Sequence, residues 1–269
     1  MKLLITTVFV VLSSLLQAQE LFVVTEPASN MPAGSVAIRV AQSYMKEKFE
    51  PGYNYHIMPE VMWGKNKNLM LHAASFISNR NGNLFLEGGS AYAKYRFYSV
   101  DDVHSHFRMA TFARASINRA DIHQEEINTM GHNSGFELGF VATKLINKVA
   151  ISSTTSFEKA TNNTNKNKFP TTAISSAGNY TLSIGKLIYP KKYTSFKQTN
   201  INIMLEVVGQ SLLGNGKSFL DIVPSLQFII NSQARIDIAY MQQLYSSMKR
   251  TAPNGIYLKL EYSFFNVTK

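Results

Sequence analysis

Hydrophobic and polar residues alternate along most of the chain from Gly34 onward. Near the C-terminus, aliphatic or aromatic residues hold the even positions of segment 256–264, and the charged residues Lys259 and Glu261 hold odd positions. Segment 234–241 repeats the pattern. A period of two places one kind of side chain on each face of a β-strand. The chain is therefore predicted to be all-β, although alternation alone does not separate a soluble sandwich from a membrane barrel.

The alternating segments are long, and twelve of them can be delimited. Their predicted bounds are 34–45, 53–64, 68–78, 86–98, 104–117, 134–145, 148–158, 175–188, 200–210, 218–229, 233–245 and 254–265. Most contain ten to fourteen residues, whereas a typical strand of a soluble protein has ~5–6. A tilted strand that crosses a membrane needs ~9–11 residues. Twelve is also an even number, as expected for bacterial single-chain outer-membrane barrels.

The connections between these segments alternate between short and long. One set comprises 65–67, 98–103, 147, 189–198 and 231–232, of which only 189–198 is not tight. The other set comprises 46–52, 79–83, 118–133, 159–172, 211–217 and 246–254. Short periplasmic turns and longer outer loops are typical of outer-membrane barrels. We therefore predict a single up-and-down antiparallel transmembrane β-barrel of about 12 strands, with both termini in the periplasm.

Two prolines and one lysine conflict with a regular barrel. Pro59 and Pro224 lie inside predicted strands, where a closed barrel offers no free edge to a residue without an N–H. Each is predicted to mark a bulge or a displaced strand boundary. Lys186 falls on the lipid face, close enough to the strand end for its ammonium group to reach the interface.

The N-terminus has the pattern of an export signal. Lys2 precedes an apolar run at 3–16, and Ala18 ends a small-residue exit. This run is shorter than the ~20 apolar residues of a membrane-spanning helix, so residues 1–18 are predicted to be a cleavable signal peptide. Residues 19–33 would then be a periplasmic segment or a short hatch in the barrel, and residues 34–269 the barrel in the outer membrane of a Gram-negative bacterium.

Composition supports this location and narrows the partners. The 269 residues include no cysteine, 45% are hydrophobic, and the mean hydropathy is −0.09. Such a chain is too apolar for disorder. The formal net charge is +10, which in a cytosolic protein would suggest nucleic acid, but an exported barrel has none to meet. We expect contacts with outer-membrane lipids and lipopolysaccharide, with the barrel-assembly machinery and with small solutes.

If the aliphatic side chains face lipid, the opposite face lines the lumen. The charged residues on that face are Arg39, Glu60, Lys94, Arg96, Arg108, Arg114, Glu137, Glu206, Asp221, Arg235, Asp237, Lys259 and Glu261. Their signs are nearly balanced, with seven bases and six acids. Two interpretations remain open: a polar pore with local selectivity, or an ion-paired filling that closes a narrow barrel.

Methionine and histidine gather on the second and third strands. The candidate ligands for a metal ion are His56, Met58, Met62, Met70 and His72. A tight turn centred on Asn66 would place Met62 opposite Met70, and Glu60 opposite His72. Thioether and imidazole together suit a soft cation such as Cu(I). The alternative is that methionine fills gaps in the lumen and that Glu60 and His72 form a buried pair.

Two clusters contain the residue types of a serine hydrolase. They are His132, Asn133 and Ser134, and His104, Ser105 and His106. A serine nucleophile needs a base within hydrogen-bond reach and a third group that orients the base. Neither cluster shows more than proximity in sequence, and no lipase signature, glycine-rich phosphate loop or paired-histidine zinc helix occurs. We predict no catalytic residues, no cofactor and no enzyme activity.

Several short strings resemble known outer-membrane proteins. They are Thr25-Glu26-Pro27, Pro32-Ala33-Gly34, Met58-Pro59-Glu60, Trp63-Gly64 and the closing strand from Leu258 to Phe265. With them the chain resembles transporter-type outer-membrane barrels of Bacteroidota and, among named families, the porin-like proteins associated with meta-pathway phenol degradation. The resemblance implies a barrel for small solutes and brings no catalytic residues with it.

The sequence thus favours passive passage or binding of small solutes through an outer-membrane barrel. A non-conducting structural or surface-interaction barrel is the first alternative. Handling of a soft metal such as copper or silver and hydrolysis of outer-membrane lipids are lesser ones. The sequence leaves open whether the lumen is open or plugged.

Overall fold

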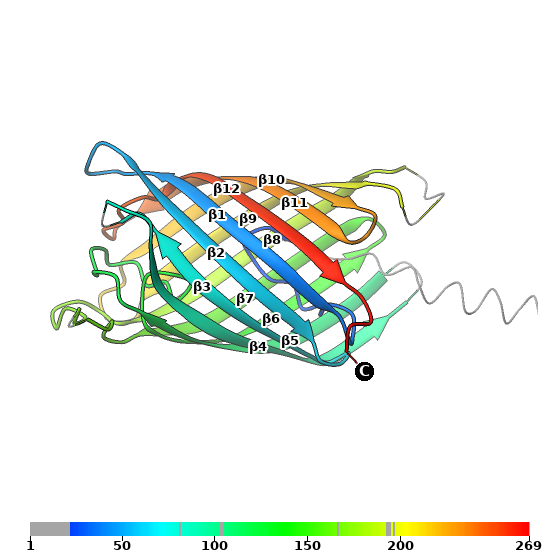
Figure 1. Ribbon diagram of the computed structural model, residues 1–269, viewed down its shortest axis with the longest axis horizontal. Helices are drawn as coiled ribbons and strands as arrows, with labels where there is room; N and C mark the ends of the chain where they lie inside the picture. The colour runs from blue at the N-terminus through cyan, green and yellow to red at the C-terminus, as the bar shows by residue number, and fades with distance from the viewer. Residues whose placement is uncertain are drawn as a thin grey trace, which may run out of the picture.

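Twelve β-strands form a closed antiparallel barrel in the computed structural model of the protein (Figure 1). The structure describes residues 22–80, 82–102, 105–165, 167–191, 195 and 197–268. The strands are β1 (Val36–Lys46), β2 (Tyr53–Gly64), β3 (Leu69–Ser78), β4 (Phe85–Asp101), β5 (Ser105–Asn118), β6 (Gly135–Ile146), β7 (Val149–Ala160), β8 (Ser176–Tyr189), β9 (Asn200–Leu212), β10 (Ser218–Ile230), β11 (Ala234–Ser246) and β12 (Asn254–Phe264). Each strand pairs with its neighbours in sequence, and β1 pairs with β12 to close the barrel.

The predicted fold class is confirmed, and every strand lies where the alternation of residues placed it. Most bounds agree within two residues. The largest difference is in β4, which continues to Asp101 instead of ending at 98. A register shift between Arg96 and Tyr98 lets the following residues keep pairing with β5, ending with Asp101 opposite His106. Among the described residues, no helix is long and apolar enough to cross a membrane.

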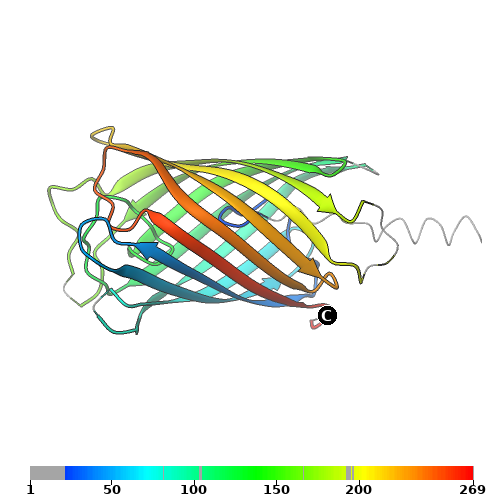
Figure 2. The ribbon, with the colours of Figure 1, turned by 90° about the horizontal axis from the view of Figure 1, so that it is seen from above.

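The two ends of the barrel differ in their connections. We call the end with residues 65–68, 147–148 and 231–233 the turn end, and the opposite end, with the longer connections, the loop end (Figures 1 and 2). The β10–β11 turn is tight because Asn231 and Ser232 both have positive φ, at 52° and 56°, as in two-residue hairpin turns. The C-terminal end of the chain lies at the turn end (Figure 1).

The barrel is apolar outside and charged inside, the reverse of a soluble protein. Outward-facing Leu182 and Ile203 are 55% and 50% exposed, whereas inward-facing Lys94 and Glu206 are both 0% exposed. Charged side chains are almost never fully buried without partners. The lumen therefore contains groups that cover and pair with these charges.

Both prolines lie inside strands and interrupt one ladder each. Pro59 pairs with Val40 of β1, but the register between β2 and β3 has no pairs at Met58 and Pro59. Pro224 pairs with Leu205 of β9, and the β10–β11 register has no pairs at positions 223 and 224. The strand boundaries are not displaced. Each proline instead removes hydrogen bonds on one side of its strand, as a residue without an N–H must.

The predicted register between β2 and β3 is wrong by two residues. Met62 lies opposite His72, and Glu60 lies opposite Ala74. The turn is longer than predicted because the side-chain oxygen of Asn66 accepts the N–H groups of Asn68 and Leu69, which extends the connection to residues 65–68. A shift of two keeps the same side chains facing inward.

Candidate functional site

The N-terminal segment (residues 22–33) runs inside the barrel. Figures 1 and 2 show it as a dark blue coil enclosed by the strands near the turn end. Val23 and Ala28 are 0% exposed. The N–H of Ala28 donates to the hydroxyl of Thr143 on β6, at 2.9 Å. The segment has no strand periodicity, yet it occupies part of the lumen. The pattern of the strands alone could not predict this position.

One carboxylate on β9 holds the start of this segment. Glu206 Oε1 accepts the N–H groups of Val23 and Val24 at 2.9 and 3.0 Å. Its Oε2 accepts the N–H and the hydroxyl of Thr25, each at 2.8 Å. Consecutive N–H groups that converge on one anion form a favourable binding concavity. Glu206 is therefore fully buried yet satisfied by the main chain of the segment.

Two lysines hold carbonyl groups of the same segment. Lys94 Nζ on β4 donates to the carbonyl oxygens of Pro27 and Ser29 at 2.7 and 2.9 Å. Lys259 Nζ on β12 donates to the carbonyl oxygen of Val23. A buried ammonium group needs hydrogen-bond acceptors for its protons. In an open lumen, water would provide these acceptors, whereas here the carbonyl oxygens of the segment provide them.

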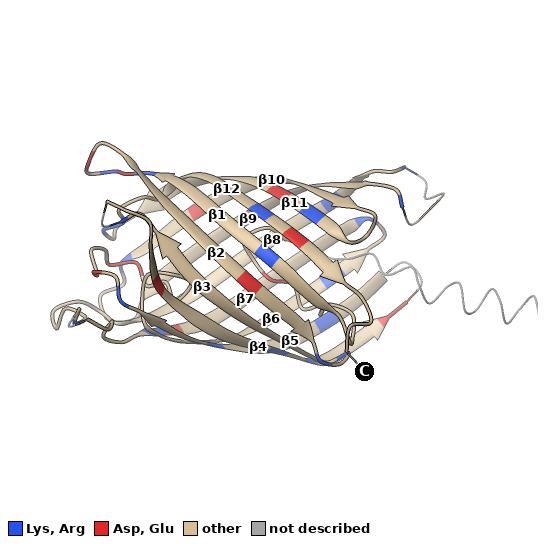
Figure 3. Ribbon diagram, in the orientation of Figure 1, with Lys and Arg blue, Asp and Glu red and all other residues tan. Residues whose placement is uncertain are grey.

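An ion-pair network runs around the barrel wall at the same level. Arg39 contacts Glu26 of the segment at 2.7 Å, Glu60 at 3.1 Å and Glu261 at 2.9 Å. Arg235 contacts Glu261 at 2.8 Å. Figure 3 shows the alternating basic and acidic positions across β2, β1, β12 and β11. The network ties the N-terminal segment to four adjacent strands through Glu26.

Apolar contacts complete the hold on the segment. Phe22 and Val23 pack in one cluster with Met204, Val223 and Ala239 of the barrel wall. Phe22 is 2% exposed. Burial of an aromatic side chain contributes roughly 1.5–3 kcal/mol, so this cluster anchors the first residues of the segment.

A second stretch of chain enters the lumen from the loop end. The β5–β6 loop (residues 119–134) places Ile127 and Thr129 at 2% and 0% exposure. The side-chain amide of Gln210 accepts from the N–H of Ile127 at 2.9 Å and donates to its carbonyl oxygen at 2.7 Å. The N–H of Thr129 donates to Glu158 at 2.6 Å. The lumen is thus occupied from both ends.

Ion pairs fasten this loop to its neighbours. Glu125 contacts Lys217 at 2.6 Å, and Glu126 contacts Arg250 at 2.7 Å. The hydrogen bond from Lys217 lowers the pKa of the Glu125 carboxyl. Arg250 also contacts Asp221 of β10 at 2.7 Å. The β5–β6 loop is therefore linked to the loops that follow β9 and β11.

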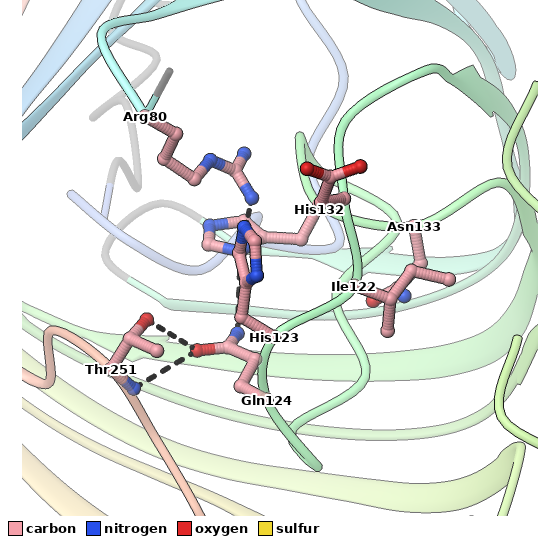
Figure 4. Close-up of a pocket in the computed structure, with 8 residues that line it drawn as sticks. Arg80, Ile122, His123, Gln124, His132, Asn133 and Thr251 are labelled. Carbon is pink, nitrogen blue, oxygen red and sulfur yellow. Dashed lines mark hydrogen bonds between the residues drawn. The ribbon is translucent and has the colours of Figure 1, made fainter. Parts of the chain in front are cut away.

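A small cavity lies at the loop end, where the β5–β6 loop meets Arg80 of the β3–β4 loop and Thr251 of the β11–β12 loop (Figure 4). Its volume is about 10 Å³, which is close to the space that one water molecule needs. His132 Nδ1 lies 3.0 Å from Arg80 and 3.2 Å from the side-chain amide of Gln124. Burial, together with the charge of Arg80, lowers the pKa of His132 well below the usual value of histidine. A neutral imidazole accepts from both donors.

The predicted lumen charges nearly all face inward and are buried. Besides those above, Arg114 pairs with Glu137 at 3.2 Å, and Arg108 pairs with Asp101 at 2.7 Å near the turn end. Arg96 is half-buried beside the β4 register shift.

Several charged residues of the lumen were not among those predicted from the strand pattern. Glu158 lies on the inward face of β7, in phase with the buried Ser152 and Ser156, so its periodicity could have found it. Glu26 and Arg250 lie outside the strands. No local pattern marks a connection that folds inward.

The five predicted metal ligands do not form one ladder. Met62 and His72 lie opposite each other, and Met70 lies opposite Gly64. Met58 packs in a separate apolar cluster. The ring of His56 lies 6.2 Å from that of His132, toward the loop end. Among the described residues, no three histidine, aspartate or glutamate side chains gather as metal ligands.

The residues of the two histidine–serine clusters have other partners than a nucleophile and its base would have. The hydroxyl of Ser134 donates to the carbonyl oxygen of Asn118 at 3.1 Å and accepts the N–H of the same residue at 2.8 Å. His132 contacts Arg80 and Gln124 instead of Ser134. Ser105 and His106 begin β5 at the turn end, and His104 lies outside the described residues.

Solved structures share this architecture, whereas no protein-family model and no curated protein sequence matches the chain significantly. A crystal structure of an outer-membrane channel from Pseudomonas putida F1 aligns with a TM-score of 0.55 and 11% identity, over 89% of this chain and 98% of that one. The β-domain of the Bordetella autotransporter BrkA aligns with a TM-score of 0.46 and 11% identity, over 86% and 100%. OccAB4 of Acinetobacter baumannii aligns at 0.40 and 10%, over 88% and 63%.

At this identity, the likeness to the Pseudomonas channel shows the fold alone. The chain has the fold of an outer-membrane β-barrel. The resemblance to the phenol-degradation porin-like family stays a prediction.

Proposed function

We propose that the chain is an outer-membrane channel for small solutes, closed at rest by the N-terminal segment and the β5–β6 loop. One observation carries the proposal. Glu206, Lys94 and Lys259, which would line an open pore, bind the main chain of the N-terminal segment instead. The channel would open when this segment leaves the lumen.

The outer surface supports a place in a membrane. Outward side chains of successive strands, such as Ile38, Leu182 and Ile203, are about half exposed and apolar. Strands of 10 to 17 residues are long enough to cross a bilayer when tilted. By the usual arrangement of such barrels, the loop end would face outward, and both termini would lie in the periplasm. Residues 1–18 would direct export.

The contacts of the segment suit reversible closure. Most of them are hydrogen bonds and ion pairs between the wall and the segment, and water can replace such bonds. Gly34 adopts a φ of 72° at the junction with β1, a conformation that glycine adopts without strain. Withdrawal of the segment would let water reach the wall charges, so neither state leaves an unpaired buried ion.

A reversible cross-link tests this gate, because the native chain contains no cysteine. Ala28 of the segment and Ala110 of β5 are both 0% exposed and pack in one cluster with Val141. In planar bilayers, the double variant Ala28→Cys/Ala110→Cys should conduct little when oxidised. It should regain the conductance of the wild type after reduction.

The single variants provide the control, since oxidation should not change their conductance. The first alternative, a non-conducting structural barrel, predicts no channel events in either redox state. That outcome, with well-folded protein, would reject the channel.

Binding of a soft cation is a second candidate function, favoured by His72. Its Nδ1 contacts Glu60 at 2.9 Å, while its buried Nε2 has no partner among the described residues. Met62 lies directly opposite, and Met70 is two positions along the same strand. A thioether and an imidazole nitrogen are suitable ligands for Cu(I) or Ag(I).

This second candidate makes its own prediction. Titration with Ag(I) should show at least tenfold weaker binding when Met62, Met70 and His72 become alanine. Met58→Ala, in the separate cluster, is the matched control and should bind as the wild type does. Equal titration curves for all variants would remove this function.

A further inference from the structure

The barrel wall recognises the N-terminal segment chiefly through its main chain. Eight main-chain groups of the segment bond to side chains of the wall: the N–H groups of Val23, Val24, Thr25 and Ala28, and the carbonyl oxygens of Phe22, Val23, Pro27 and Ser29. Thr25, Glu26 and Ser29 add side-chain contacts. Main-chain groups are common to all peptides, so most of these bonds do not depend on the sequence of the segment.

The wall presents an acceptor at the start of the segment and donors at both ends. Near its start, Glu206 accepts three consecutive N–H groups and Lys259 donates to the carbonyl oxygen of Val23. Near its end, Lys94 donates to the carbonyl oxygens of Pro27 and Ser29. In a free peptide, the ammonium terminus would meet Glu206 and the carboxylate terminus would meet Lys94. Charge complementarity of this kind fixes the direction in which a ligand binds.

An apolar pocket accompanies the polar groups. The side chain of Phe22 lies among Leu145, Met204 and Val223. An apolar residue near the N-terminus of a ligand would occupy the same place. The site therefore combines recognition of the main chain with a preference for one side-chain type.

We infer that the interior of the barrel is a binding site for short peptides, and that the N-terminal segment occupies this site as a built-in ligand. The inference rests on the proposed function, because it names the class of solute that displaces the segment. A sugar offers no cationic group to Glu206 and no anionic group to Lys94. A metal cation would neutralise Glu206 but leave Lys94 and Lys259 without acceptors.

A full-length variant with a released segment tests the inference. In Val23→Asp, a new carboxylate would lie beside Glu206 and within the apolar cluster, which should expel the segment. The probe is a fluorescein-labelled peptide with the sequence of residues 22–29, and its anisotropy is measured with the protein in detergent micelles. We expect the released variant to bind the probe at least tenfold more tightly than the wild type does.

Matched variants locate the site. Within the released variant, Glu206→Gln and Lys94→Met should each weaken binding of the probe at least tenfold. The controls make the same charge changes on exposed residues: Glu50→Gln in the β1–β2 loop, and Lys144→Met on the outer face of β6. Both controls should bind the probe as the released variant does.

Changes to the peptide distinguish recognition of any peptide main chain from recognition of the sequence of the N-terminal segment alone. A scrambled peptide should bind within about fivefold, whereas N-methylation of the amides equivalent to Val23, Val24 and Thr25 should abolish binding. If the scrambled peptide fails to bind, the site fits only its own segment and the inference is overturned. Loss of the effect of Glu206→Gln overturns it as well.

Folding and function are controlled separately. Folding of each variant is checked by its heat-dependent shift in gel mobility, and Phe22→Gly replaces Val23→Asp if the latter does not fold. A folded, released variant that binds no peptide overturns the inference, even if it conducts. Peptide binding by a protein that never conducts would instead support the inference and reject the channel.

Discussion

The buried ions of the lumen depend on partners from distant parts of the chain. Glu206 is 0% exposed, and its partner Val23 is 183 positions away in sequence. Removing an ion from water costs several kcal/mol unless its hydrogen bonds are replaced. The balance of lumen charges therefore reflects ion pairs within a filled interior in this structure. It does not describe the walls of an open pore.

At the residue scale, we expect His132 to make insertion of the β5–β6 loop depend on pH. Its pKa lies well below ~6.5, the value of an exposed histidine, because burial and Arg80 disfavour its charged form. A displaced loop would bind a proton at a pH where the inserted loop does not. Insertion of the loop is thus most stable above about pH 6.5 and loses up to ~1.4 kcal/mol per pH unit below it.

Channel recordings between pH 8 and 5 should therefore show more frequent opening as the pH falls. His132→Gln keeps a side-chain acceptor for Arg80 and should flatten this profile. The Glu125–Lys217 pair should not contribute to this pH dependence. The pKa of the Glu125 carboxyl is lowered, so Glu125 stays charged between pH 8 and 5. If opening depends on pH equally in His132→Gln and in the wild type, His132 is not the group responsible.

At the scale of elements, strand positions followed from local periodicity, but the β2–β3 register did not. The side chain of Asn66 lengthens the turn by binding two N–H groups. Gly64 therefore lies opposite Met70, two residues further along β3 than predicted, and every pair on the two strands shifts by two. Side-chain bonds to the main chain of this kind can stabilise one of several competing turn conformations. The spacing of residues in the sequence could not show which conformation forms.

Replacement of a strand proline should stabilise the barrel. Pro224 is exposed on the outer face and lies where the β10–β11 ladder has no pairs. Pro224→Val restores an N–H and should add about 0.5–1.5 kcal/mol of stability, or roughly 2–4 °C in Tm for each kcal/mol. The temperature of the gel-mobility shift measures this change. Leu226→Val, on the same face, should give no increase. A Tm for Pro224→Val at or below that of the wild type would show that the missing N–H of Pro224 does not destabilise the barrel.

At the scale of the whole molecule, the orientation in the membrane can be tested by labelling. The chain contains no cysteine, so single cysteines report their own location. Asn215→Cys, exposed at the loop end, should react with a membrane-impermeant maleimide in intact cells. Lys65→Cys, exposed at the turn end, should react only after permeabilisation. The opposite labelling pattern would invert the proposed orientation.

The sequence by itself determined the wall of the barrel. A period of two marks each strand and its two faces within about a dozen residues. The alternation of short and long connections indicates at which end of the barrel each connection lies. These features are local, so neither the strands nor their inward face required knowledge of distant contacts.

Only the tertiary structure decided what fills the wall. The N-terminal segment and the β5–β6 loop lack periodicity, and their partners, such as Glu206 and Gln210, lie 83 or more positions away. Their place depends on burying charges that the strands already direct inward. That requirement acts on the folded barrel as a whole, and no segment of the sequence expresses it alone.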